Sequence, residues 1–256
     1  MTQMDDHAFA AWAAEQAGAR LLEVRGQGLE GRELKDAGDA AAQEVLAALL
    51  AEHRPDDFVL SEEASDDKSR VDADRVWIID PLDGTREFSE PPRDDWAVHV
   101  ALWARSGSGS GSGELVAGAV AQPGLGVTFH TGRPPVVPAR TAPRPRIAVS
   151  RTRPPEFVAA LAEEIGAELV PMGSAGAKVI SVARDVTDAY VHAGGQYEWD
   201  SAAPVAVARA SGLFTSRIDG SPLIYNQPEV LLPDLVVCRP ELAEPILGFV
   251  RRHGVE

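Results

Sequence analysis

One stretch decides how this chain folds: Trp77-Ile78-Ile79-Asp80-Pro81-Leu82-Asp83-Gly84-Thr85-Arg86-Glu87-Phe88. The apolar run at its start, Val76 to Ile79, predicts a short buried strand. Two aspartates follow, and two neighbouring carboxylates at the end of a buried strand are costly unless a cation lies between them. Hard oxygen ligands favour Mg²⁺ or Mn²⁺ over zinc. The alternative is a tight turn, because Asp, Pro and Gly are turn formers.

Two other segments place acids in a similar setting. Upstream, Phe58-Val59-Leu60-Ser61-Glu62-Glu63 is a second short apolar strand that ends in adjacent carboxylates. Downstream, Glu198-Trp199-Asp200-Ser201-Ala202-Ala203-Pro204 places an acid before an alanine-rich run that favours a helix. Each segment has a simpler interpretation, with Glu62 and Glu63 as solvated loop acids and Asp200 as a helix N-cap. Together, in this order, the three segments favour a shared metal site.

These motifs resemble a known family. DPLDGTREF preceded by WII, an upstream SEE and a downstream WDSAAP are similar to the inositol monophosphatase superfamily of Mg²⁺-dependent, lithium-sensitive phosphatases. Within it the chain most resembles the CysQ branch, the 3'(2'),5'-bisphosphate nucleotidases, in the form found in actinobacteria. The resemblance covers the chain from about Asp36 to its C-terminus. It implies an α/β layered fold of the inositol monophosphatase/sugar phosphatase type.

The resemblance also implies a set of metal ligands. It predicts two or three Mg²⁺ ions, for which Mn²⁺ can substitute. Asp80 is the expected bridging ligand. Glu62 and the carbonyl of Leu82 would complete one metal shell, and Asp83 and Asp200 would hold the second metal. Such ions suit in-line attack of water on a phosphate ester, because one activates the water and the other stabilises the leaving oxygen.

Gly84 and Thr85 are expected beside the reacting phosphate. Glycine lets the backbone approach a phosphate, and N–H groups at a helix start bind anions. In the family, the position of Thr85 carries a hydroxyl that orients the attacking water, with an aspartate from an upstream TxxD-like segment as its partner. Here the segment Lys35-Asp36-Ala37-Gly38-Asp39 is shorter and lacks the threonine. Asp39 is the candidate partner, with a helix N-cap as its alternative role. Glu63 is expected as a nearby base or as an exposed side chain.

Further polar residues are expected at the far end of the substrate. Ser174 is the predicted N-cap of a helix, and Lys178 lies one turn further on the same face. In the bisphosphate nucleotidases, a Ser-Arg pair and a Gly-Ser…Lys pattern at matching places bind the nucleotide and its second phosphate. The alternative is that Arg151 and Lys178 are surface side chains. The residues expected to contact substrate are Gly84, Thr85, Arg86, Ser150, Arg151, Ser174, Lys178 and Asp200.

Composition restricts the partners. The formal net charge of −15 argues against a nucleic-acid polymer or an anionic membrane, because both need a basic face. Metal ions would reverse the sign of the local charge at a phosphate site. There is no apolar run long enough to span a membrane and no signal-peptide pattern, so we expect a cytoplasmic protein. The single cysteine, Cys238, is expected in a buried strand, and His99 is expected in a strand as a structural histidine whose polar atoms have hydrogen-bond partners.

The chain is expected to form two subdomains. Residues 1–143 would make an N-terminal α+β subdomain that carries the metal motifs, and residues 144–256 a C-terminal α/β subdomain that completes the active site. The Pro- and Arg-rich segment Arg133–Arg146 separates them. Helices are predicted at about 7–22 and 39–52, with a loop or weak hairpin between them at 23–35. The Ser-Gly repeat that begins at Ser106 is expected to form an exposed hairpin tip.

The sequence therefore predicts a Mg²⁺-dependent phosphatase acting on a small phosphate ester. Its expected substrate is adenosine 3',5'-bisphosphate, from which it removes the 3'-phosphate, with 3'-phosphoadenylyl sulfate as a second substrate and a role in sulfur assimilation. One alternative is hydrolysis of inositol-1-phosphate or fructose 1,6-bisphosphate. Another is a non-catalytic metal- or phosphate-binding regulatory protein, favoured only by the irregular segment Lys35–Asp39. The resemblance also implies a homodimer.

Overall fold

The strand that ends in the two aspartates lies inside a five-stranded sheet. In this computed structural model, which describes residues 4–106 and 113–255, the apolar run forms β2 (Arg75–Asp83). The first sheet has the order β1 (Phe58–Ser61), β2, β3 (Ala97–Arg105), β4 (Gly113–Gln122) and β5 (Val127–His130). β1 is parallel to β2, and the other neighbours are antiparallel.

The C-terminal half supplies a second five-stranded sheet. Its order is β7 (Glu168–Met172), β6 (Arg146–Ser150), β8 (Ala189–Ala193), β10 (Asp234–Cys238) and β9 (Phe214–Ser216). β6 is parallel to both of its neighbours, while β10 is antiparallel to β8 and β9. Cys238 is buried in β10, as predicted.

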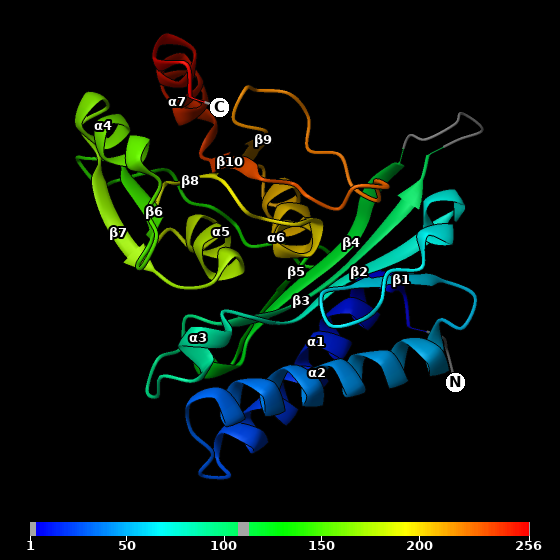
Figure 1. Ribbon diagram of the computed structural model, residues 1–256. Helices are drawn as coiled ribbons and strands as arrows, with labels where there is room; N and C mark the ends of the chain where they lie inside the picture. Colours follow the sequence, from blue (N-terminus) through cyan, green and yellow to red (C-terminus); the bar gives the residue numbers. More distant parts are fainter. Residues whose placement is uncertain (1–3, 107–112, 256) are drawn as a thin grey trace.

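The helices separate and cover the two sheets (Figure 1). One face of the first sheet packs against α1 (Asp6–Arg25) and α2 (Gly31–His53). Between the sheets lie α5 (Ala175–Ala183) and α6 (Glu198–Ala210). The far face of the second sheet packs against α4 (Glu156–Glu164) and α7 (Pro240–His253). The short helices are α3 (Thr85–Phe88), η1 (Lys68–Asp72) and η2 (Pro123–Leu125). This order of layers confirms the predicted α/β layered fold.

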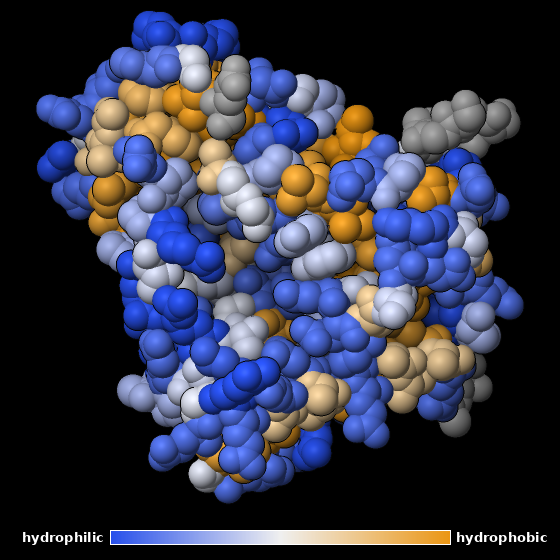
Figure 2. All heavy atoms as spheres, in the orientation of Figure 1, coloured by the Kyte–Doolittle hydropathy of each residue, from blue (hydrophilic) through white to orange (hydrophobic). Residues whose placement is uncertain are grey.

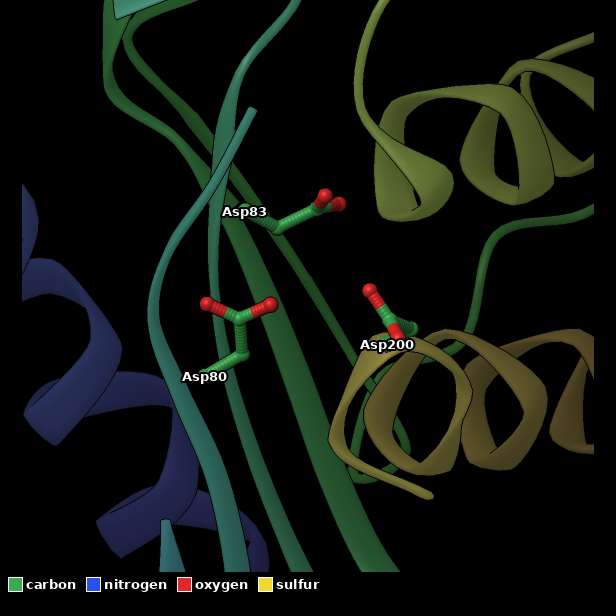
Figure 3. A group of neighbouring side chains, drawn as sticks. All are labelled: Asp80, Asp83 and Asp200. Atoms are coloured by element: carbon green, nitrogen blue, oxygen red, sulfur yellow. The ribbon is translucent and has the colours of Figure 1, made fainter. Parts of the chain in front are cut away.

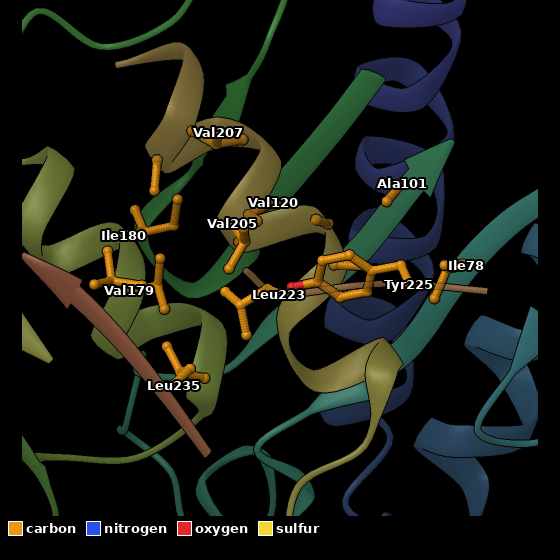
Figure 4. Close-up of a cluster of buried hydrophobic side chains, with 14 of the residues drawn as sticks. Ile78, Ala101, Val120, Val179, Ile180, Val205, Val207, Leu223, Tyr225 and Leu235 are labelled. Carbon is orange, nitrogen blue, oxygen red and sulfur yellow. The ribbon is translucent and has the colours of Figure 1, made fainter. Parts of the chain in front are cut away.

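The central apolar cluster joins the two sheets through α5 and α6 (Figure 4). A helix between two sheets is buried on most of its surface, so α6 is rich in small apolar residues. The approach is close, because a Cβ at Gly118 of β4 would lie 2.7 Å from the Cβ of Ala206. The middle of α6 is therefore held close against the first sheet, and the first turn of the same helix carries Asp200 beside β2.

One predicted boundary is wrong. The segment 23–35 was expected as a loop or hairpin, but α1 extends to Arg25 and α2 already begins at Gly31. The glycines of this segment suggested a long break, but Gly26 caps the end of α1 and Gly31 begins α2, so the break is short. Gly38 lies further along α2 and provides space there, since a Cβ on it would lie 2.6 Å from the ring of Phe88. Asp39 is therefore inside a helix, and its expected alternative role as an N-cap is wrong.

Some predictions remain as they were. β3 and β4 pair on either side of the Ser-Gly repeat, but the predicted hairpin tip falls almost wholly on residues 107–112, outside the described residues. The division into subdomains at residue 143 stays a prediction. Within residues 4–106 and 113–255, no helix combines the length and apolarity needed to cross a membrane.

Candidate active site

β2 continues through both aspartates and ends at Asp83, and Gly84 alone separates it from α3. The register with β3 shifts between Asp80 and Asp83, and such an irregularity re-aims the side chains that follow it. The Asp80 carboxylate accepts a 3.0 Å hydrogen bond from the backbone N–H of Leu82. Gly84 then adopts φ 88°, a left-handed conformation that favours glycine, and α3 begins at Thr85. The two aspartates therefore belong to the irregular end of the strand rather than to a separate tight turn, and the alternative of a simple Asp-Pro-Leu-Asp-Gly turn is wrong.

Three aspartates converge at the end of β2 (Figure 3). Asp80, Asp83 and Asp200 each offer a carboxylate oxygen, and these oxygens all lie within 4.8 Å of one another. Asp200 belongs to the first turn of α6 and accepts a 2.7 Å hydrogen bond from the N–H of Tyr197. The N-cap of α6 is Tyr197 and Asp200 is its third residue, so the interpretation of Asp200 as the N-cap is wrong, although its side chain helps to cap the helix and also faces the cluster.

Most of this negative charge has no protein cation beside it. Burial, reinforced by Glu62, Asp83 and Asp200, raises the pKa of Asp80 well above its ordinary value. Burial and the charge of Asp83 raise the pKa of Asp200 to about 6. Burial, followed by repulsion from Asp200 and Asp83, raises the pKa of Glu62 to about 7. Crowded carboxylates that destabilise one another as anions, and offer only oxygen, fit a hard divalent cation.

Asp83 is the exception within the cluster. Its carboxylate accepts hydrogen bonds from the Ser174 hydroxyl at 2.5 Å and from the N–H groups of Ala175 at 3.1 Å and Gly176 at 2.6 Å. These donors form the N-terminus of α5, where the helix dipole favours an anion. Although burial acts to raise the pKa of Asp83, His99 and these donors outweigh it and lower the pKa to about 2.

His99 is a site residue that the sequence did not assign. It lies in β3, a strand that was predicted, directly opposite Asp80 in the β2–β3 pairing, and it is fully buried. Its Nε2 is 3.2 Å from Asp83 Oδ2, and its Nδ1 is 3.1 Å from the carbonyl oxygen of Trp199. Burial acts to lower the pKa of His99, but Asp83 and the Trp199 carbonyl raise it overall. The sequence signal that could have identified His99 as a site residue is its position in the predicted strand that follows the aspartate motif.

Thr85 lies between the cluster and α2. Its hydroxyl donates to the Leu82 carbonyl at 3.2 Å and lies 3.5 Å from Asp39 Oδ1. Burial and the nearby Glu63 raise the pKa of Asp39 to about 7. Glu63 itself is exposed and lines a separate hollow together with Asp36 and Asp39. The structure therefore brings the predicted Thr85–Asp39 pair together across two elements, despite the shortened segment that precedes Asp39.

A pocket of about 630 Å³ opens over Asp83 and Asp200. Figure 2 shows this hollow bordered mainly by hydrophilic residues. All eight residues predicted to contact substrate line it, whereas Asp39, Glu62, Glu63, Asp80 and Leu82 lie outside its lining. The basic residues of its wall come from both halves of the chain and are Lys35, Arg86, Arg151, Arg153 and Lys178. The sequence analysis did not assign Lys35 or Arg153, because no local pattern links them to the motif.

Arg151 and Lys178, two of the three predicted substrate cations, have different surroundings. Arg151 is half-buried and donates to Glu87 at 2.8 Å and to Glu90 at 2.9 Å. Lys178 is 5% exposed, so the interpretation as a surface lysine is wrong. Its Nζ donates to the Ser174 carbonyl at 2.6 Å, and burial lowers its pKa. Both side chains therefore have protein partners that hold them at the pocket wall.

Comparisons with known proteins agree with this geometry. A profile of the inositol monophosphatase family matches residues 3–253. A 3'-phosphoadenosine 5'-phosphate phosphatase from Mycobacterium leprae (strain TN) is 49% identical, over 97% of this chain and 94% of its own length. One of the same name from Mycobacterium tuberculosis (strain CDC 1551 / Oshkosh) is 51% identical, over 91% and 89%. The crystal structure of CysQ from Bacteroides thetaiotaomicron superimposes with a TM-score of 0.73 at 27% identity, covering 90% of this chain and 96% of that chain.

Proposed function

This chain belongs to the inositol monophosphatase family, and from that premise we propose that it is a Mg²⁺-dependent phosphatase that removes the 3'-phosphate of adenosine 3',5'-bisphosphate. The sulfated nucleotide 3'-phosphoadenylyl sulfate is the expected second substrate. Relatives at 49% and 51% identity are named 3'-phosphoadenosine 5'-phosphate phosphatases, and this supports the substrate.

One observation carries the proposal: an acidic cluster, in which burial and mutual repulsion raise the pKa of Asp80 and Asp200, lies next to a pocket whose wall is basic. Asp83 and Asp200 belong to both, because they are members of the cluster and also line the pocket. A phosphate ester that reaches the two aspartates extends its other end towards the basic wall. A substrate with a second anionic group suits this arrangement better than one with a single phosphate.

The residues of the chain would divide the chemistry between them. Asp80, Asp83, Asp200 and Glu62 would hold divalent cations, which activate water for attack on phosphorus and stabilise the departing oxygen. The Thr85 hydroxyl, 3.5 Å from Asp39 Oδ1, would accept a hydrogen bond from the attacking water. An ionised Asp39 would accept the hydrogen bond that the Thr85 hydroxyl donates, and so keep the hydroxyl oxygen turned to the water.

The basic wall would hold the remainder of the substrate. Ser174 donates to Asp83 at the start of α5, Lys178 lies one turn further along α5, and Arg151 is oriented by its two glutamates. Arg86 is exposed and forms no ion pair with any of the described residues. Arg153 of the same wall is also exposed and forms no ion pair among the described residues, so Arg86 and Arg153 are the cations whose charge is most available to a second phosphate.

The test is phosphate release from four substrates at equal, low concentration: adenosine 3',5'-bisphosphate, 3'-phosphoadenylyl sulfate, inositol-1-phosphate and fructose 1,6-bisphosphate. We expect the first to be hydrolysed fastest with Mg²⁺ and the reaction to be inhibited by Li⁺. Faster hydrolysis of inositol-1-phosphate or fructose 1,6-bisphosphate would contradict the proposed substrate while leaving the phosphatase intact.

Two variants separate enzyme from non-catalytic protein. Asp83→Asn removes a cluster carboxylate and should abolish turnover, whereas Asp94→Asn changes an exposed acid outside the cluster and should preserve it. If wild type and Asp83→Asn are equally inert with every substrate, the enzyme proposal is wrong. The irregular segment that favoured a regulatory protein has become ordinary helix in α2, which leaves that alternative without support.

The proposal also covers the oligomeric state, the cellular location and the working cation. We expect a homodimer, which light scattering of the purified chain would test. We expect a cytoplasmic enzyme, which fractionation of the source cells would test. We also expect Mg²⁺ to be the working cation, with Mn²⁺ able to replace it.

A further inference from the structure

His99 occupies a place that its strand alone does not explain. The side chain is fully buried and stands opposite Asp80 in the β2–β3 register. Its ring contacts elements from both halves of the chain, because Asp83 belongs to β2 and the Trp199 carbonyl belongs to the first turn of α6. Asp200 is the next residue after Trp199. One ring therefore touches one cluster aspartate and the backbone that carries another.

The two ring nitrogens have defined tasks. A carbonyl oxygen only accepts hydrogen bonds, so the 3.1 Å contact between Nδ1 and Trp199 requires the proton on Nδ1. Nε2 then faces Asp83 Oδ2 at 3.2 Å. Nδ1 is also 3.9 Å from Asp80 Oδ2. The ring thus lies between the first sheet and α6 as a spacer of fixed size, with a polar atom directed at each side.

The third neighbour, α5, is shaped around the ring. A Cβ on Gly176 would lie 2.0 Å from His99 Nε2, so only glycine allows α5 this close. The N–H of the same Gly176 donates to Asp83 Oδ2 at 2.6 Å. Gly176 therefore makes room for the ring and holds the carboxylate that the ring faces.

We propose that His99 is a positioning residue that sets the spacing between Asp83 and Asp200, and thereby the affinity of the cation they share. This inference rests on the proposed metal-dependent function of the site. Groups that contact the metal ligands without contacting the metal, and so orient those ligands, typically contribute roughly 10- to 100-fold to metal affinity. A ring that only filled space in the core would contribute to folding stability and leave metal affinity unchanged.

The test measures metal binding without substrate. Titration calorimetry with Mn²⁺ on the full chain, and the rise in Tm caused by Mg²⁺, are compared for wild type, His99→Leu and His99→Gln. We expect His99→Leu to weaken binding of one ion by roughly 10- to 100-fold and to shrink the Tm rise. His99→Gln keeps an amide that reaches one of the two partners, so its loss should be smaller. KM for the phosphate ester should change less than the Mg²⁺ concentration needed for half-maximal rate.

A matched control lies on the same strand. Val100 is fully buried in β3 and belongs to the cluster that packs under α1 and α2, away from the acids. Val100→Ala should lower the Tm of the metal-free protein while the Mg²⁺-induced rise stays as in wild type. This separates loss of packing from loss of positioning, even where both variants are less stable.

A double variant tests the spacing directly. Gly176→Ala should weaken metal binding, because its new Cβ displaces the ring. His99→Asn is shorter and vacates that space, so Gly176→Ala should cost little further affinity when added to it. Two results would overturn the proposed role of His99 while leaving the proposed function intact. One is that the losses of metal affinity caused by Gly176→Ala and His99→Asn are fully additive, and the other is that metal binding is unchanged in both His99→Leu and His99→Gln. Absence of metal binding in the wild type would overturn the proposed function as well.

Discussion

Asp80 and Asp83 differ more than their shared motif suggests. Both are buried near the end of β2, and both face the same cluster. Asp83 meets the N-terminus of α5 and His99, and its pKa falls to about 2. Asp80 receives a single backbone hydrogen bond, from Leu82, and its pKa rises well above the ordinary value. The protein itself stabilises one carboxylate and leaves the other for a cation.

The difference shows how a protein can fold before its metal arrives. If every ligand were uncompensated, the metal-free site would carry several mutually repelling buried anions. With Asp83 held by α5, the position of one ligand is fixed in advance, and the strongest demand for positive charge falls on Asp80, Glu62 and Asp200. The two aspartates should therefore respond differently when each is replaced.

The largest effect should come from the two aspartates themselves. Asp80→Asn and Asp83→Asn should each lower kcat/KM by roughly 10³-fold or more, since each removes several kcal/mol of transition-state stabilisation. Their effects on the metal-free protein should have opposite signs. In chelator, Asp80→Asn should raise the free energy of unfolding, because it removes an uncompensated buried acid, and Asp83→Asn should lower it by about 1–3 kcal/mol, because it weakens paired donors. Urea unfolding followed by circular dichroism measures both, and a stabilised Asp83→Asn would break the comparison.

The second effect is the dependence of stability on pH. The pKa of Glu62 is raised to about 7 and that of Asp200 to about 6, so the stability they contribute is complete below about pH 4 and is lost as pH rises through 6 to 7. Asp83 acts in the opposite sense, since its contribution is present above about pH 4 and is lost as pH falls towards 2. A tenfold difference in a group's proton affinity between the folded and unfolded chain corresponds to about 1.4 kcal/mol.

The measurement compares the metal-free and Mg²⁺-saturated protein in urea between about pH 5 and pH 8. The metal-free protein should lose stability across this interval, and Mg²⁺ should remove most of the loss by favouring the ionised carboxylates. Parallel pH profiles with and without Mg²⁺ would show that these acids do not face the cation.

The third effect concerns Thr85, whose hydroxyl bonds the backbone between the two aspartates. Thr85→Val keeps the shape of the side chain and removes the hydroxyl that contacts Leu82 and Asp39. We expect kcat to fall by roughly 10²-fold, within the usual range for a proton-transfer or water-orienting group, with metal affinity nearly unchanged. Steady-state kinetics at saturating Mg²⁺ tests this. A variant that loses metal affinity and keeps kcat would assign Thr85 to the metal site instead.

The smallest effect lies on the basic wall opposite the acids. Arg86→Gln removes an exposed cation that forms no ion pair with any of the described residues. KM for adenosine 3',5'-bisphosphate should rise about tenfold, the value of one charge-assisted hydrogen bond, while KM for adenosine 3'-monophosphate should not change. Arg20→Gln, on the exposed surface of α1, serves as the control. Equal changes for both substrates would exclude Arg86 from recognition of the second phosphate.

The sequence predicted well what is local. The order of strands and helices follows from apolar runs and their lengths, and the acids of the cluster follow strands or begin a helix where local motifs mark them. It failed where packing between distant segments decides. The glycine-rich segment 23–35 suggested a loop, but α2 already begins at Gly31, and the alternative of a surface lysine at position 178 is wrong because Lys178 is buried. Likewise, the donors that distinguish Asp83 from Asp80 come from a helix whose first residue is nearly a hundred positions later, which no local pattern reveals.

The most direct test is an anomalous difference map from a crystal soaked in Mn²⁺. The account predicts peaks among the carboxylates of Asp80, Asp83 and Asp200, with one of them also bordered by Glu62. A well-ordered map with these side chains in place and no peak among them would contradict the claim that the cluster exists to hold the catalytic cations.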